Sequence, residues 1–140
     1  MSILDIQKLI NKYPYVDARA KKLECNYFSD EVTLVYENSD DVDICCKFSG
    51  CYKTVFDHNK FDKLGAVKNM NYGQMPYFMF DINITDILVE KEHFYICKID
   101  MGLLEVEIWC KNIIVNRIKS ISTDGKTCFE FTESIEGDSC

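Results

Sequence analysis

Several features are missing from this chain of 140 residues, and each absence excludes a class of protein. No apolar stretch approaches 18 residues, so the sequence predicts no membrane-spanning helix. The first residues include neither the basic segment nor the apolar segment of a signal peptide, which favours a cytoplasmic location. No glycine-rich phosphate loop or nucleotide fingerprint occurs. No repeat or low-complexity segment is present, and an apolar content of 47% argues against disorder.

Basic residues are in short supply. Sixteen Lys and Arg face 23 Asp and Glu, which gives a net charge of −7. Residues 71–140 carry 6 basic and 12 acidic groups, so the excess lies in the second half. This balance argues against a nucleic-acid partner and an anionic membrane. It favours a basic protein partner, although acidity can also serve solubility alone.

The eight cysteines do not form a zinc-binding pattern. No C-x-x-C spacing occurs, the nearest approach being Cys46-x4-Cys51, and neither histidine stands at ligand spacing from it. We therefore expect no metal and no cofactor. Since nothing marks export, the sequence predicts reduced, structural cysteines and about eight free thiols in the denatured protein.

Alternation of apolar and polar residues dominates the second half of the chain. It predicts four strands, Tyr77–Val89, His93–Met101, Leu103–Cys110 and Ile113–Ile121, with a bulge near Asp86. The first half predicts a helix over residues 3–12. Strands follow over Asp17–Phe28, Glu31–Glu37 and Val42–Phe56, the last broken at Ser49-Gly50, and then an irregular loop over residues 57–76. A last short strand is predicted over Thr127–Thr132.

These elements predict a mainly β (α+β) fold in a single domain spanning residues 1–140. A helix within residues 1–14 accompanies one antiparallel sheet of about seven or eight strands over residues 15–132, followed by a frayed tail over 133–140. We expect this single sheet to curl toward a half-barrel or a sandwich. The predicted core consists of Ile6, Leu34, Ile44, Phe48, Phe80, Ile82, Ile84, Ile96, Val106 and Ile108.

Residues suited to catalysis are few, and the sequence predicts that the protein is not an enzyme. Only His58 and His93 can act as bases near neutral pH. A hydrolase that uses Asp57, His58 or a cysteine remains an alternative. Glu105 and Glu107 share one face of a strand, a separation that suits acid–base chemistry but more often serves solvation.

The best candidate for a partner-binding surface is the outward face of Leu103–Cys110. If Leu104, Val106 and Ile108 point inward, then Glu105, Glu107 and Trp109 point outward. Trp109 is either buried by sheet curvature under a loop or helix, or an aromatic anchor with acidic neighbours. Asp81 extends this surface from the neighbouring part of the sheet, and the loop residues Asp57, Asp62 and Tyr72 are the next candidates.

Three short motifs resemble small bacterial immunity proteins of polymorphic or contact-dependent toxin systems. They are Tyr15-Val16-Asp17-Ala18, Phe48-Ser49-Gly50 and Glu107-Ile108-Trp109-Cys110, and the resemblance covers roughly residues 3–119. It implies a cytoplasmic inhibitor that binds and blocks a cognate toxin domain, commonly a basic nuclease. Where relatives often have a His before the Asp-Ala pair, this chain has Val16.

A rival function remains open. The concave face of a curled sheet can bind a small apolar ligand, and the Phe, Tyr and Met content permits this. The sequence does not indicate an oligomeric state.

Overall fold

The computed structural model describes residues 2–13, 15–39, 41–58, 66–67 and 70–120. Their elements follow in the order α1 (Ile3–Lys12), β1 (Ala20–Asn26), β2 (Glu31–Glu37), β3 (Val42–Ser49), β4 (Lys53–His58), the short 3-10 helix η2 (Tyr72–Gln74), β5 (Asp81–Val89), β6 (Glu92–Asp100), β7 (Leu104–Cys110) and β8 (Asn112–Lys119). The predicted strand over 127–132 and the predicted tail over 133–140 lie outside the described residues.

The N-terminal helix forms where the sequence predicts it. The Ser2 hydroxyl accepts a hydrogen bond of 3.2 Å from the amide of Asp5, and so provides a partner for a donor that the first turn leaves free. Ile6 and Ile10, one turn apart, are the buried residues of α1. This apolar stripe attaches the helix to the rest of the fold.

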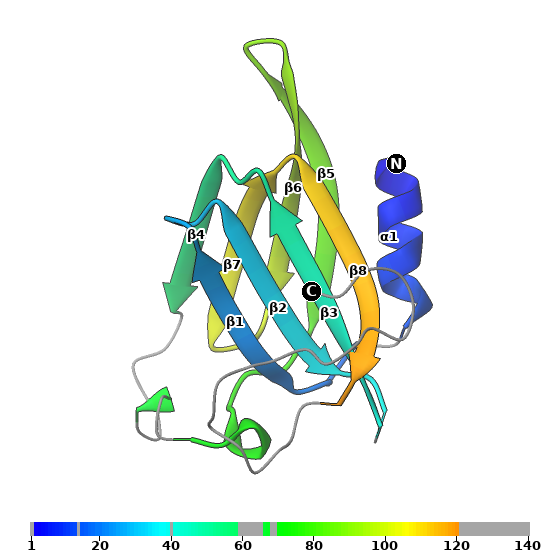
Figure 1. Cartoon of the computed structure of the whole chain (residues 1–140), viewed down its shortest axis with the longest axis vertical. Helices are drawn as coiled ribbons and strands as arrows, with labels where there is room; N and C mark the ends of the chain where they lie inside the picture. Colours follow the sequence, from blue (N-terminus) through cyan, green and yellow to red (C-terminus); the bar gives the residue numbers. More distant parts are fainter. Residues whose placement is uncertain (1, 14, 40, 59–65, 68–69, 121–140) are drawn as a thin grey trace.

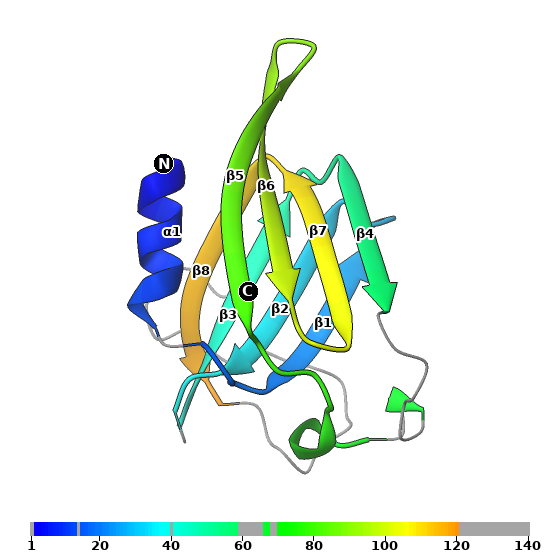
Figure 2. The ribbon, with the colours of Figure 1, turned by 180° about the vertical axis from the view of Figure 1, so that it is seen from behind.

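The strands form two antiparallel sheets that lie face to face (Figures 1 and 2). One sheet has the order β1-β2-β3-β8 and the other the order β4-β7-β6-β5. The prediction of a mainly β, antiparallel fold with one helix is confirmed. The prediction of a single curled sheet is wrong, because the chain crosses from one sheet to the other between β3 and β4 and again between β7 and β8.

The two crossings lie together at one end of the sandwich. Lys111 donates a backbone hydrogen bond to Ser49 at 3.1 Å, and Tyr52 donates one to Trp109 at 2.7 Å. Gly50 has a φ of +63°, and a Cβ there would lie only 3.1 Å from the Cβ of Lys111. Glycine is therefore required at the predicted break between β3 and β4.

The core fills the space between the two sheets. All predicted core residues are buried except Phe80 and Ile96. Phe80 is 46% exposed because the alternation of β5 does not extend into the irregular segment before it, where Met79 is buried instead. Ile96 is half-buried because it stands opposite Trp109 on the outward side of its sheet.

The hairpin of β5 and β6 extends beyond the sandwich at its upper end in Figures 1 and 2. Its register runs without a shift from the pair Asp81 and Asp100 to the pair Val89 and Glu92. The predicted bulge near Asp86 is therefore wrong. The alternation changes there because the strands leave the sandwich and no longer have one buried and one exposed face.

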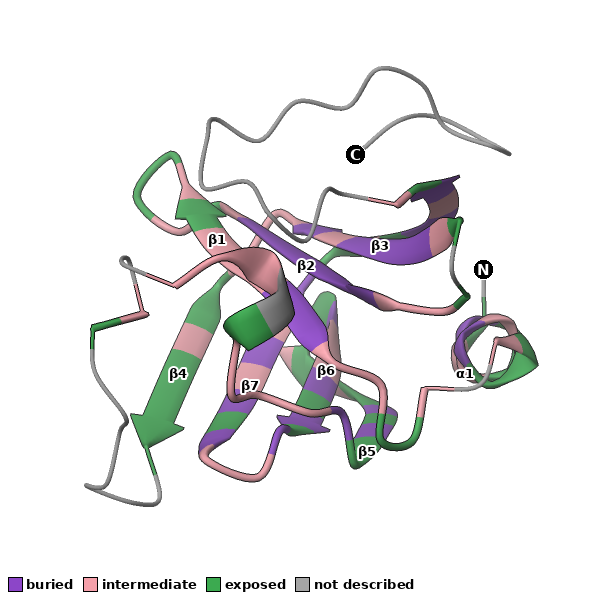
Figure 3. Cartoon of the chain, turned by 90° about the horizontal axis from the view of Figure 1, so that it is seen from below, coloured by how far each residue is buried: buried purple, intermediate pink, exposed green. Residues whose placement is uncertain are grey.

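The free edge of β5 is covered by α1. The side-chain amide of Gln7 donates to the carbonyl of Ile82 at 3.0 Å and accepts from the amide of Ile84 at 2.9 Å. The side chain of Gln7 thus takes the place of a neighbouring strand. Occupied in this way, the edge of β5 is less open to pairing with another chain. The opposite edge strand, β4, is exposed along most of its length (Figure 3).

Candidate functional site

Four carboxylates form a single row across the outward side of the sheet β4-β7-β6-β5. Asp57 of β4 pairs with Glu105 of β7, Glu105 with Asp100 of β6, and Asp100 with Asp81 of β5. All four residues are exposed. Residues that pair in this way hold their Cβ atoms about 4.5–5.5 Å apart. We call these four residues the acidic row.

No cation of the described chain is paired directly with the acidic row; the neighbouring Lys98 lies 3.9 Å from Glu107 instead. Within the described residues, no Lys, Arg or His forms an ion pair with a member of the row. Asp100 alone accepts a hydrogen bond from a backbone amide, that of Gly102, at 2.9 Å. Like charges directly opposite each other destabilise a sheet. The row therefore costs the fold some stability and would attract a basic partner.

Trp109 and Glu107 continue the same outward face beyond the row. The indole Nε1 donates to Glu107 Oε2 at 2.7 Å. The ring of Tyr52 lies 6.2 Å from that of Trp109, and Lys53 Nζ lies 4.9 Å from the indole centroid. Among the described residues, Trp109 is half-buried and in contact with these neighbours. Glu107 is also half-buried, because it orients the indole and lies 3.9 Å from Lys98 Nζ.

An open hollow of about 360 Å³ lies over the acidic row. Its lining combines the four carboxylates with Glu107, Lys98 and the apolar Val55. Below them the floor consists of Ile99 and Val106, which belong to the core. A shallow recess with mainly acidic walls has room and charge for a protruding basic side chain of a protein.

The structure brings together five of the residues that the sequence singled out for partner binding. Asp57, Asp81, Glu105, Glu107 and Trp109 share this outward face. Tyr72 lies elsewhere, on η2, and lines a different cavity. Asp62 lies outside the described residues. The assignment of these residues to toxin binding stays a prediction.

Sequence reasoning missed Asp100 and two aromatic residues, Tyr52 beside Trp109 and Phe94 beside Tyr52. Asp100 completes the acidic row, and Phe94 places its ring 5.0 Å from that of Tyr52. The alternation of β6 indicates that Ile96, Lys98 and Asp100 share a face. Which face they share depends on the pairing of β6 with β7, and this pairing is not visible in one strand alone.

A protein-family model matches most of this chain. The family model described as immunity protein PIM7 matches residues 2–117. The chain belongs to the immunity protein PIM7 family. This confirms the resemblance to small immunity proteins of toxin systems. No curated protein matches the chain.

In this PIM7 family member, the motif Tyr15-Val16-Asp17-Ala18 connects the segment after α1 to the chain around the start of β5. The Tyr15 hydroxyl accepts a hydrogen bond of 3.4 Å from the amide of Ile82, which ties the segment after α1 to β5. Asp17 has a φ of 66° and donates its amide to the carbonyl of Met79 at 2.7 Å. These contacts link the start of β1 to the chain that leads into β5, and so join the two sheets.

The free thiols of the described chain are poorly suited to nucleophilic attack. Burial raises the pKa of Cys46 and Cys110 to about 12 and that of Cys51 to about 11. The pKa values of Cys97 and Cys25 are also raised, mainly by desolvation. A thiol with a raised pKa is mostly protonated at neutral pH and is a weak nucleophile. Cys45 is disulfide-bonded, so the expectation that all eight cysteines are reduced is wrong.

A second cavity, of about 390 Å³, is mainly apolar. Its lining within the described part of the chain comes from β1, the end of β4, the start of β7 and the segment around η2, and includes Leu23, Val67, Tyr72, Met75, Tyr77, Met101 and Leu104. His58 also lines it, whereas Asp57 lies on the acidic face. The adjacent pair Asp57-His58 is therefore divided between two surfaces and does not form one site.

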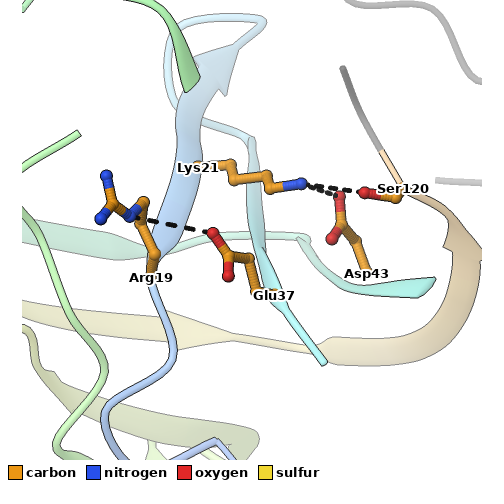
Figure 4. A network of polar contacts seen from close by, with 5 residues as sticks. All are labelled: Arg19, Lys21, Glu37, Asp43 and Ser120. Atoms are coloured by element: carbon orange, nitrogen blue, oxygen red, sulfur yellow. Dashed lines mark hydrogen bonds and ion pairs between the residues drawn. The ribbon is translucent and has the colours of Figure 1, made fainter. Parts of the chain in front are cut away.

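A buried ion pair lies on the sheet opposite the acidic row (Figure 4). Lys21 Nζ donates to Asp43 Oδ2 at 3.1 Å and to Ser120 Oγ at 3.0 Å. Both charged side chains are almost inaccessible, at 2% and 0% exposure. Beside them Arg19 and Glu37 form a looser, half-buried pair at 3.8 Å. The buried pair joins β1 to β3 and to the end of β8.

Among the residues that the structure describes, no three His, Cys, Asp or Glu side chains gather in a way that would hold a metal ion. None of the helices in the described ranges is long and apolar enough to cross a membrane.

Proposed function

We propose that this PIM7 family member acts in the cytoplasm by binding a cognate toxin domain through the acidic face and blocking its active site. The acidic face is the outward side of β4, β7, β6 and β5, with the acidic row and Trp109. The observation that carries this proposal is the row itself, in which four aligned carboxylates have no cationic partner in the described chain. The toxin that best complements it is a basic, nuclease-type domain.

Neutralisation by this route needs no catalytic group and no cofactor. A nuclease active site is basic because it binds phosphates. A protein surface with carboxylates in a row competes for the same cations, while Trp109 supplies apolar contact area beside them. The same negative charge disfavours nucleic acid and an anionic membrane as partners of this chain.

The first prediction concerns stoichiometry. When the protein is added to the toxin domain encoded beside it, nuclease activity should fall in proportion and disappear near one equivalent. The complex should elute as a single species that contains both chains. A catalytic role would show a different result, namely complete inactivation at a small fraction of one equivalent, with a chemically altered toxin in the mass spectrum.

A second candidate function is binding of a small apolar molecule. The apolar cavity of about 390 Å³ supports it, because its volume falls in the range of ligand pockets. If this candidate is correct, native mass spectrometry of freshly purified protein should show a retained molecule. Met101→Trp, which would fill the cavity, should release it. A single mass equal to that of the bare chain would argue against this function.

A further inference from the structure

The turn between β1 and β2 has an unusual backbone. Tyr27, Phe28 and Ser29 have φ values of 55°, 57° and 70°, so three consecutive residues are left-handed. This region suits glycine and asparagine, and a bulky residue there is an outlier. The sequence pattern predicted Tyr27 and Phe28 as the end of a strand, and the structure corrects this. Here the two aromatic residues lie in the turn itself.

Both aromatic side chains project into solvent. Tyr27 is 73% exposed and Phe28 is fully exposed. Neither belongs to the core, and neither has an aromatic neighbour within the described chain. The turn therefore combines backbone strain with exposed apolar surface. Both reduce the stability of the protein on its own, and no aromatic or core contact of these two side chains within the described residues offsets them. Strain of this kind is concentrated at sites that bind or switch.

The turn is nevertheless held in place. Asp30 donates its amide to the carbonyl of Tyr27 at 3.0 Å, which closes the turn. The strands on either side remain in register up to the pair Asn26 and Glu31. Glu31 is also 3.4 Å from Lys47 Nζ of β3. A rigid aromatic tip loses little conformational entropy when a partner covers it.

The tip is connected to the aromatic end of the acidic face. Cys51 donates its amide to the carbonyl of Asp30 at 3.1 Å, and the next residue, Tyr52, donates to Trp109 at 2.7 Å. Two backbone hydrogen bonds thus link the turn to the strand that carries Trp109. The upper left of Figure 1 shows the turn beside the start of β4. One partner of ordinary interface size would reach both.

We propose that Tyr27 and Phe28 are a second anchor for the toxin domain that binds the acidic face, and that they enter an apolar recess bordering its basic active site. This inference rests on the proposed function. The occupant is the toxin rather than a second copy of this chain, because a chain with a net charge of −7 repels its own copy and attracts a basic domain. Aromatic anchors beside a charged surface supply affinity, while the charges supply orientation.

The test replaces both aromatic residues with asparagine in the full chain. Asparagine tolerates the left-handed conformation, so Tyr27→Asn/Phe28→Asn should keep or raise the melting temperature. Affinity for the toxin domain encoded beside the chain should fall at least about thirtyfold, mainly through faster dissociation. The matched control is Leu4→Gln, because Leu4 is 71% exposed on α1 and should leave affinity unchanged.

Four results would overturn the inference. Affinity of the double variant within about twofold of the parent chain would show that the tip does not touch the toxin. An equal loss in Leu4→Gln would show a nonspecific effect of removing apolar surface. A dimer of the parent chain alone, dissociated in the double variant, would assign the tip to a second copy. If the parent chain does not bind the toxin domain at all, the proposed function fails with it, whereas the first three results leave that function intact.

Discussion

A chain that carries Asp57→Lys and Glu105→Lys together is expected to lose at least about a hundredfold in affinity for the toxin domain, with its fold unchanged. Close charge pairs across an interface couple by about 1.5–7 kcal/mol each. Loss of two pairs at the lower limit removes about 3 kcal/mol, and each 1.4 kcal/mol corresponds to about tenfold in affinity. Isothermal titration calorimetry with the purified toxin domain measures the change.

The choice of Asp57 and Glu105 follows from their surroundings. Both are exposed and face each other across β4 and β7. Two lysines there repel each other as the two carboxylates do, but the lysine at position 105 faces Asp100, so the sheet should keep its stability or gain a little. Glu107 is less suitable, although the sequence singled it out, because it orients the indole of Trp109.

A matched control separates the acidic face from net charge alone. Asp41→Lys with Glu90→Lys makes the same change in formal charge at two exposed turns, β2–β3 and β5–β6, which lie outside the acidic row and outside the turn of Tyr27 and Phe28. This control should slow association slightly through the overall field and keep the complex stable. Equal losses in the two double variants would remove the acidic face from consideration. Association with the parent chain should also slow as salt rises from low to physiological concentration, and a rate independent of salt would contradict the electrostatic argument.

Lys21→Met is expected to destabilise the fold by about 3–5 kcal/mol, because it leaves Asp43 charged and inaccessible without its lysine. Total stabilities of domains are about 5–15 kcal/mol, so this loss removes a large share of the total. Urea unfolding followed by circular dichroism, with the slope compared between variants, measures it. Lys21→Met combined with Asp43→Leu should recover most of the loss, because an apolar pair of similar volume replaces the ions.

Arg19→Met provides the control for the buried pair. Arg19 and Glu37 lie next to Lys21 and Asp43 but are 28% and 41% exposed, at a distance of 3.8 Å. A partly exposed pair at this distance contributes about 0–1 kcal/mol, so the loss of stability in this variant should be well below that in Lys21→Met. Similar losses in Arg19→Met and Lys21→Met would show that burial does not decide the strength of these pairs. Both variants should bind the toxin normally when folded, because Arg19 and Lys21 lie outside the acidic face and at the end of β1 remote from the turn of Tyr27 and Phe28.

The acidic face shows which features of the structure a sequence pattern can predict and which it cannot. Alternation within β7 correctly placed Glu105, Glu107 and Trp109 on one side, because successive side chains of a strand point to opposite faces. The same reasoning failed at Phe80 and Ile96, where strand bounds and pairing decide the exposed side. Asp100 was missed for this reason, and its place in the acidic row follows from the register of β6 with β7.

By itself, the sequence determined the helix over residues 3–12, the antiparallel β class and the faces of individual strands, because each depends on the periodicity of neighbouring residues. The tertiary structure decided that β4 pairs with β7 and β8 with β3, because a strand after a short turn can pair with its predecessor or cross to the opposite sheet with the same pattern. This choice aligns carboxylates from four strands in one row. The tertiary structure also decided the left-handed turn at Tyr27 and Phe28. Their residue types favour a strand, but the pairing of β1 with β2 fixes their backbone in the turn.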